Sequence, residues 1–124
     1  MESSIISGQL VTVDVNTICD GIAVPRVGNI TFELAKQYLD GVLTVSDNEV
    51  SKTVFLLLER AKVLAEPSGV VGLAALMNEN HIFRGKKVCT IISGGNVDLS
   101  LITRIINRQL VQLGKFVMVV MATN

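Results

Sequence analysis

The chain has 124 residues, enough for one domain of ordinary size, and its 11 lysines and arginines balance its 11 aspartates and glutamates. A zero net charge predicts no basic surface for nucleic acid, and no apolar run approaches the roughly 18 residues of a membrane helix. Hydrophobic residues make up 49% of the chain but aromatic residues only 4%, so the sequence predicts an interior of Val, Ile, Leu and Ala.

The first 30 residues predict short elements separated by turns. A weak helical stretch over 3–8 ends in a glycine, and residues 10–15 are typical of either a strand or an extended loop. Residues 17–24 are apolar around an Asp-Gly step, which predicts a strand broken by a turn. The start of the chain lacks the basic and apolar regions of a signal peptide. The two cysteines, Cys19 and Cys89, have no metal-ligand spacing and favour the reducing cytoplasm.

The middle of the chain alternates between helical and extended patterns. A helix is expected over 31–40, followed by a short strand over 42–45. Ser46 and Glu49 have the spacing of a capping box, in which a serine begins a helix and a glutamate three residues later bonds back to it. Apolar residues then recur at helical spacing, which predicts a helix over 47–62.

Residues 63–78 predict an extended segment followed by a second, smaller helix. Residues 63–65 are expected to be extended, and Pro67 suits the first turn of a helix. The helix itself is predicted over 70–78, where small residues permit close packing. A polar loop over 78–85 carries the only histidine, and a single loop histidine indicates no metal site.

The last third contains the pattern on which the functional hypothesis depends. Residues 86–92 predict a strand buried in a parallel sheet, and residues 99–113 predict an amphipathic helix that ends at Gly114. Residues 116–121 predict a final apolar strand. Together these alternating elements predict an α/β fold with a partial parallel sheet flanked by helices.

Between that strand and helix lies the sequence Ser93-Gly94-Gly95-Asn96-Val97-Asp98. Open α/β sheets bind ligands at the carboxyl ends of their strands, and glycines let the backbone approach a ligand closely. The segment therefore predicts a binding site, although a strand-to-helix turn without a ligand has the same pattern.

Three segments together resemble the serine/threonine dehydratases, which are pyridoxal-phosphate enzymes of the tryptophan-synthase-β fold (fold type II). The segments are Thr17-Ile-Cys-Asp-Gly-Ile-Ala-Val, Glu66-Pro-Ser-Gly and Ser93-Gly-Gly-Asn-Val-Asp. The stretches 26–29 and 40–49 resemble the same family. The resemblance implies the C-terminal part of a catalytic domain over 1–114. Residues 115–124 would then begin a regulatory ACT-like domain or a tail.

The resemblance assigns cofactor-binding roles to four residues. Ser93 matches the serine whose hydroxyl meets the pyridine nitrogen, and Gly94 leaves room for the ring edge. Glu66 matches an acidic residue close to the ring, and Gly21 belongs to a backbone segment against the ring face. The implied cofactor is pyridoxal phosphate. The implied reaction converts L-threonine to 2-oxobutanoate and ammonia, in isoleucine synthesis or threonine catabolism.

Two parts of the family site have no counterpart in this sequence. The family forms a Schiff base through a lysine in a Ser-x-Lys-x-Arg-Gly setting, and it binds the phosphate with a run of glycines. No lysine here has that setting, and the longest glycine run is Gly94-Gly95. We therefore expect no catalytic residue in this chain, and an isolated chain that is an inactive fragment. Its expected partner is the missing N-terminal half, or full-length subunits of a homo-oligomer.

Three alternatives stay open. The chain could derive from a serine racemase or serine dehydratase, which share the segments around Glu66 and Ser93. It could be a non-catalytic remnant that docks on a full-length subunit. It could also be a small α/β domain that binds nothing.

Overall fold

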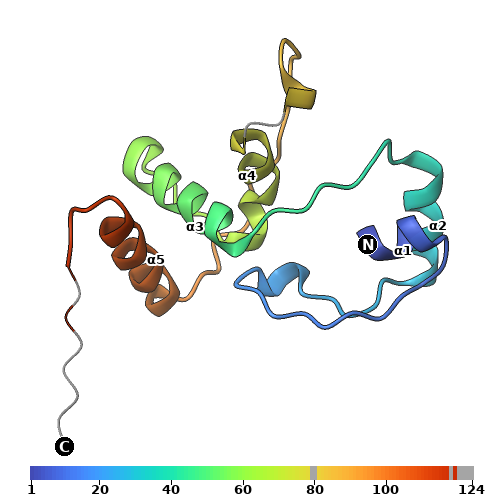
Figure 1. Cartoon of the computed structure of the whole chain (residues 1–124), viewed down its shortest axis with the longest axis horizontal. Coiled ribbons are helices and arrows are strands. Elements are labelled where there is room, and N and C mark those ends of the chain that lie inside the picture. Colours follow the sequence, from blue (N-terminus) through green and yellow to red (C-terminus); the bar gives the residue numbers. More distant parts are fainter. Residues whose placement is uncertain (79–80, 118, 120–124) are drawn as a thin grey trace, which may run out of the picture.

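The computed structural model describes residues 1–78, 81–117 and 119, which form helices joined by long extended segments (Figure 1). The helices are, in chain order, α1 (Glu2–Ser7), η1 (Asp20–Ile22), α2 (Asn29–Tyr38), α3 (Asp47–Leu56), η2 (Leu57–Ala61), η3 (Pro67–Val70), α4 (Val71–Met77), η4 (His81–Phe83) and α5 (Leu99–Gln112). η2 is a π-helical continuation of α3, and the other η elements are short 3-10 helices. In the described part of the chain, no helix has the length and apolarity needed to cross a membrane.

The core lies among α3, α4 and α5. α3 is central and packs against α4 and η3 on one side and against α5 on the other (Figure 1). Val50, Val54 and Val70 are at most 2% exposed, so the predicted aliphatic interior is confirmed at this point. The remaining buried members of the cluster are Cys19, Phe55, Ala65, Ala74, Ile102 and Ile105.

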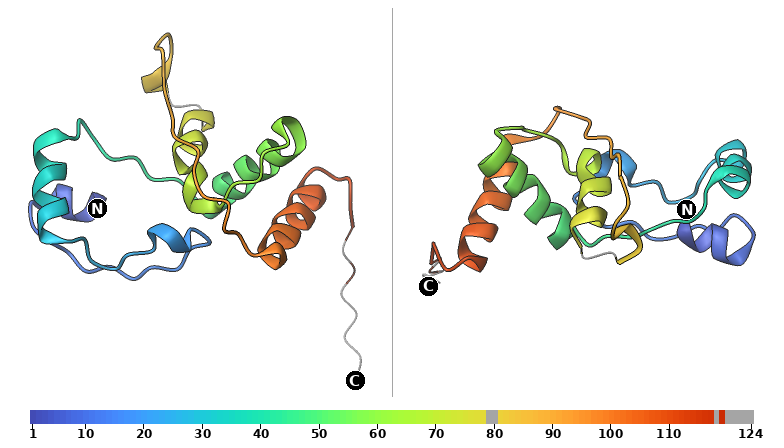
Figure 2. Two further views of the ribbon diagram at one scale, coloured as in Figure 1. Left: turned by 180° about the vertical axis from the view of Figure 1, so that it is seen from behind. Right: turned by 90° about the horizontal axis from the view of Figure 1, so that it is seen from above.

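α1 and α2 form a second, smaller unit that stands apart from these three helices in the views from behind and from above (Figure 2). Phe32 and Ala35 of α2 are buried here, and so is Ser4 of α1, whose hydroxyl accepts a hydrogen bond from the Val11 N–H at 3.1 Å. Three extended segments leave this unit: residues 8–19 and 23–28 connect it to η1 beside the core, and residues 39–46 connect it to α3.

The predicted helices are confirmed, and local capping explains where two of them begin and end. Ser46 and Glu49 form the expected capping box at the start of α3. α5 ends in a Schellman motif, in which the Lys115 N–H donates to the Leu110 carbonyl at 2.9 Å. Gly114 adopts the left-handed conformation that this motif requires, with φ 67°.

Within the described residues, the predicted strands are not formed. Among the described residues none lies in a β-strand, and the segments 17–24, 42–45 and 86–92 are extended or turn-like instead. The Asp-Gly step in the first of them forms η1, in agreement with the predicted turn. The physical reason is that a strand exists only through hydrogen bonds to a neighbouring strand, and these segments have none in the described chain. Half of the strand predicted over 116–121 lies outside the described residues.

Two short stretches of backbone nevertheless pair with each other. The Glu66 N–H donates to the Gly94 carbonyl at 2.9 Å, and the Ser93 N–H donates to the Gly69 carbonyl at 3.2 Å. Gly69 is buried so closely against Ser93 that a Cβ atom there would overlap the Ser93 carbonyl group. These contacts attach the segment before α5 to the turn before α4.

The chain exposes far more surface than a complete domain of its size. Its accessible area is 9105 Å², whereas a compact monomer of 13.3 kDa exposes about 6,450 Å². Large apolar side chains account for part of the excess: Ile91 is 82% exposed and Leu99 is 73% exposed.

Changing Glu49 to Gln tests the capping box. Hydrogen bonds from the Ser46 N–H and hydroxyl, at 2.6 and 2.9 Å, hold the pKa of Glu49 below its ordinary value. A lowered folded-state pKa contributes stability above the unfolded-state pKa and loses it as the pH falls through the folded-state value. We expect the melting temperature of Glu49→Gln to lie below wild type at pH 7 and to converge with it at acidic pH. Glu33→Gln, in α2, is the control, and parallel pH profiles for Glu49→Gln and wild type would contradict the prediction.

Changing Gly69 to Ala tests the pairing of the two backbone stretches. The new methyl group meets a backbone carbonyl that cannot turn aside, so we expect a loss of roughly 3 kcal/mol in the free energy of unfolding. Urea unfolding followed by circular dichroism measures it. Gly95→Ala is the control, because a Cβ atom at Gly95 meets nothing within 4 Å. Equal stabilities of the two variants would refute the close contact.

Candidate functional site

The loop that carries Gly21 is attached to the first residue of α3. The Asp47 carboxylate accepts hydrogen bonds from the Thr17 hydroxyl at 2.5 Å and from the Ile18 N–H at 3.2 Å. The Cys19 N–H in turn donates to the Thr17 hydroxyl at 3.1 Å. These bonds hold the loop beside the core and so determine where η1 and Gly21 lie.

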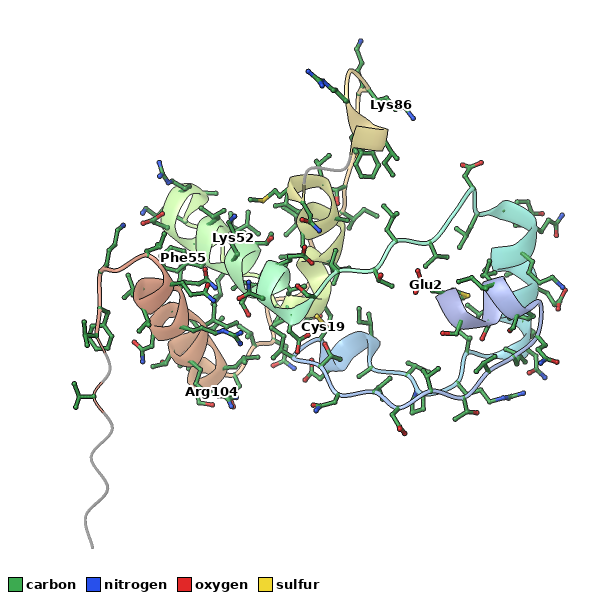
Figure 3. All side chains as sticks on the ribbon, in the orientation of Figure 1. Glu2, Cys19, Lys52, Phe55, Lys86 and Arg104 are labelled. Carbon is green, nitrogen blue, oxygen red and sulfur yellow. The ribbon has the colours of Figure 1, made fainter. Side chains whose placement is uncertain are left out.

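Cys19 lies on the same loop, and its side chain points from the loop toward the core helices (Figure 3). Its side chain is 4% exposed and belongs to the hydrophobic cluster of α3 and α5. Burial raises the pKa of the Cys19 thiol, with smaller contributions from the nearby Asp47 and Asp20. The thiol is therefore protonated at neutral pH and acts as an apolar core group.

The Glu66 side chain lies directly over the backbone of Gly94. A Cβ atom at Gly94 would overlap the Cγ, Cδ and Oε1 atoms of Glu66. Gly94 also has φ 75°, a conformation that other residues rarely adopt. Only glycine fits at this position, because both the backbone conformation and the close glutamate exclude a side chain.

Gly21 completes the cluster from the third segment. A Cβ atom at Gly21 would lie 3.0 Å from the Ser68 hydroxyl oxygen and 3.5 Å from Glu66 Oε1. The structure thus brings Gly21, Glu66 and Gly94 together, although they are 45 and 28 residues apart in the sequence. We call the cluster of these three residues and Ser68 the cradle.

Ser93 belongs to the cradle through its backbone. Its N–H donates to Gly69, whereas the residue is exposed and its hydroxyl makes no hydrogen bond to a residue that the structure describes. The hydroxyl is thus free to meet a ligand, which is the condition for the role that the resemblance implies.

The cradle carries a carboxylate without a cation beside it. Glu66 makes no ion pair within the described chain, and no lysine is among the atoms nearest to Gly21 or Gly94. Lys86 lies at the tip of an arm that projects away from the helices (Figure 3). The described residues also contain no cluster that could hold a metal ion.

An apolar groove lies elsewhere, between residues 41–45, α4 and residues 88–90. Its volume is about 340 Å³, and its walls include Leu43, Leu76 and Phe83. None of the four predicted cofactor-binding residues lines this groove. It is therefore an exposed packing surface separate from the cradle.

Sequence reasoning did not single out Ser68, Gly69 or Asp47. Ser68 and Gly69 lie inside the segment Glu66-Pro-Ser-Gly. The signal for them was this segment, if all four of its residues had been considered and not Glu66 alone. Asp47 lies between the capping residues Ser46 and Glu49, and nothing in the sequence indicates that it also binds a loop 30 residues earlier.

Comparison with known proteins identifies the family. The family model described as pyridoxal-phosphate dependent enzyme matches residues 1–94, which include most of the helices and all four predicted cofactor-binding residues. An L-threonine ammonia-lyase of Thermotoga maritima is 48% identical over 103 residues. That match covers 83% of this chain and 25% of the ammonia-lyase, so the chain spans about a quarter of the length of this relative.

Solved structures agree with the family assignment. A serine racemase of Dictyostelium discoideum is similar with a TM-score of 0.69 at 40% identity, over 79% of this chain and 32% of the racemase. The processed form of threonine deaminase isoform 2 from Solanum lycopersicum is similar with a TM-score of 0.75 at 27% identity, over 84% of this chain and 31% of the deaminase. The helices and extended segments described above therefore reproduce about a third of such an enzyme fold, and the chain belongs to the family of pyridoxal-phosphate dependent enzymes.

Proposed function

We propose that the chain is part of a threonine ammonia-lyase and supplies one wall of its cofactor site. The observation that carries the proposal is the cradle, in which glycines and a carboxylate from three segments meet in a protein 48% identical to an L-threonine ammonia-lyase. The proposed reaction converts L-threonine to 2-oxobutanoate and ammonia. In a cell it would serve amino-acid metabolism, with isoleucine synthesis or threonine catabolism as its context.

The groups in the cradle fit the ring of pyridoxal phosphate. Gly21 and Gly94 have no side chains, so only their backbone atoms border the cradle. The Ser68 hydroxyl oxygen is buried without a hydrogen-bond partner among the described residues. In this proposal the Ser93 hydroxyl binds the ring nitrogen, Gly94 and Gly21 border the ring, and Glu66 supplies the acidic group beside it. When bound, the cofactor supplies the electron sink for loss of the substrate α-proton.

Ser93 would set the strength of that electron sink. A neutral hydroxyl cannot hold the ring nitrogen protonated as a carboxylate would. The ring then withdraws electrons moderately, which suits elimination, because the charge leaves with the hydroxyl group of the substrate.

Catalysis also requires groups from other polypeptide. The Schiff-base lysine and the phosphate-binding glycine run of the family are not in this sequence, so we propose that the N-terminal part of the domain or a full-length subunit supplies them. The exposed apolar residues and the 340 Å³ groove support a partner of that kind. Once that polypeptide is present, we infer that 42–45 and 86–92 become strands of a parallel sheet.

The domain division and location are part of the same proposal. We assign 1–114 to the catalytic domain, because the Schellman motif closes α5 at Gly114. Residues 115–124, most of which lie outside the described part, would begin a regulatory ACT-like domain or a tail. A cytoplasmic location agrees with two free cysteines, of which Cys89 is exposed.

The alternative substrate is serine. The similarity to a serine racemase at 40% identity supports it, but the ammonia-lyase relative is more similar in sequence. A serine-specific enzyme would release pyruvate or D-serine instead of 2-oxobutanoate, so product analysis separates the two. A remnant that only docks on a full-length subunit would yield no product when paired with the missing half.

The purified chain is the first material to test. We expect a titration with pyridoxal phosphate to give no imine absorbance band, and addition of threonine to give no 2-oxobutanoate, because no lysine borders the cradle. A stable imine with turnover by the chain alone would overturn this prediction.

Reconstitution then tests the function directly. The chain is mixed with a shortened Thermotoga maritima L-threonine ammonia-lyase that lacks the matching segment. We expect 2-oxobutanoate from threonine in the mixture and from neither component alone. The control is a mixture with the Ser93→Ala chain, which we expect to assemble but to turn over more slowly. Turnover of serine in preference to threonine would favour the alternative.

A further inference from the structure

The buried Ser68 hydroxyl oxygen has no hydrogen-bond partner among the described residues, which is unusual for a buried polar group. Within the described chain, the Ser68 hydroxyl oxygen and the Gln109 side-chain nitrogen are the buried side-chain atoms that have no hydrogen-bond partner. Gln109 lies in α5, away from the cradle, whereas Ser68 borders the cradle. Buried hydroxyl groups are almost always paired, so the Ser68 hydroxyl has an unused capacity to donate a hydrogen bond.

The position of Glu66 indicates an acceptor for that hydrogen bond. Its carboxyl group lies over Gly94, on the side where any added side-chain atom would meet it. Glu66 Oε1 and the Ser68 hydroxyl oxygen both lie within 3.5 Å of the position that a Cβ atom at Gly21 would take. The two groups therefore border the same small space without being bonded to each other.

A ligand that enters the cradle cannot share the space over Gly94 with the Glu66 carboxyl group. The side chain has to turn aside, and the unpaired Ser68 hydroxyl lies beside the space left open by Gly21. Hydrogen bonds to an ionised carboxylate are stronger than those between neutral groups, so this contact would hold Glu66 in its new position.

We propose that Ser68 is a positioning residue for Glu66: when a planar ring ligand occupies the cradle, Glu66 leaves Gly94 and accepts a hydrogen bond from the Ser68 hydroxyl. This inference rests on the proposed function, because it takes the ring of pyridoxal phosphate as the ligand. In the ligand-free chain Glu66 fills the cradle and Ser68 is unpaired. In the ligand-bound state both groups are satisfied.

Thermal unfolding of the 124-residue chain tests the ligand-free state. We expect Ser68→Ala to keep or raise the melting temperature, because it removes a buried hydroxyl that has no partner. Ser4→Ala is the control: Ser4 is a buried serine whose hydroxyl accepts a hydrogen bond from the Val11 N–H, so this variant should melt lower. If Ser68→Ala lowers the melting temperature as Ser4→Ala does, its hydroxyl already has a partner and the proposal is wrong.

Ligand binding by the reconstituted mixture tests the other state. The dissociation constant of pyridoxal phosphate is measured by equilibrium dialysis, without substrate. We expect Ser68→Ala to raise it about tenfold, the effect of losing one hydrogen bond to a charged group, and Ser68→Thr to restore it. In a Glu66→Ala background, Ser68→Ala should have no further effect, since its role acts through Glu66.

The outcomes separate the two proposals. An equal loss of affinity from Ser68→Ala with and without Glu66 would mean direct contact with the ligand and would overturn the positioning role. If the unaltered mixture binds no pyridoxal phosphate, the proposed function fails. The melting temperatures of Ser68→Ala and Ser4→Ala would still decide whether Ser68 is unpaired.

Discussion

The structure of the cradle depends on the pairing of two short backbone stretches. The Glu66 N–H donates to the Gly94 carbonyl and the Ser93 N–H donates to the Gly69 carbonyl. These bonds hold together two backbone stretches whose outer residues, Glu66 and Gly94, are 28 residues apart in the sequence. Because Gly69 packs directly on the Ser93 carbonyl group, this register leaves no space for a side chain there. The same pairing places the Glu66 carboxyl group over Gly94. The position of the acidic group in the cradle therefore depends on a main-chain contact.

The rest of the structure consists of a packed helical core and of extended segments that form no strand among the described residues. α3, α4 and α5 bury an aliphatic cluster in the way that any small helical core does. Beside this cluster, the extended segment 86–92 keeps the apolar side chains of Val88, Ile91 and Ile92 exposed. A main chain that is extended but unpaired has unused hydrogen-bonding groups along its edge, and these are what a neighbouring strand would satisfy.

Features that depend on near neighbours were predictable from the sequence. The capping box of Ser46 and Glu49 and the helix end at Gly114 each involve residues within five positions of one another. The strand over 86–92 was predicted from its composition, but a strand also needs a partner, which the described chain does not provide. The meeting of Gly21, Glu66 and Gly94 followed from a family resemblance. The unpaired state of Ser68 depends on atoms from two distant segments, which no local pattern reveals.

Asp47 connects the folding of α3 with the placement of Gly21. It is the first residue of that helix, and its carboxylate also holds the Ile18 N–H and the Thr17 hydroxyl. If the first turn of α3 unwinds, the loop loses these two hydrogen bonds at the same moment. Fraying of a helix end, a local motion that requires no global unfolding, would therefore open one side of the cradle. In amide hydrogen exchange, Ile18 would then become unprotected together with the first turn of α3, even though the two are separated by some thirty residues of sequence.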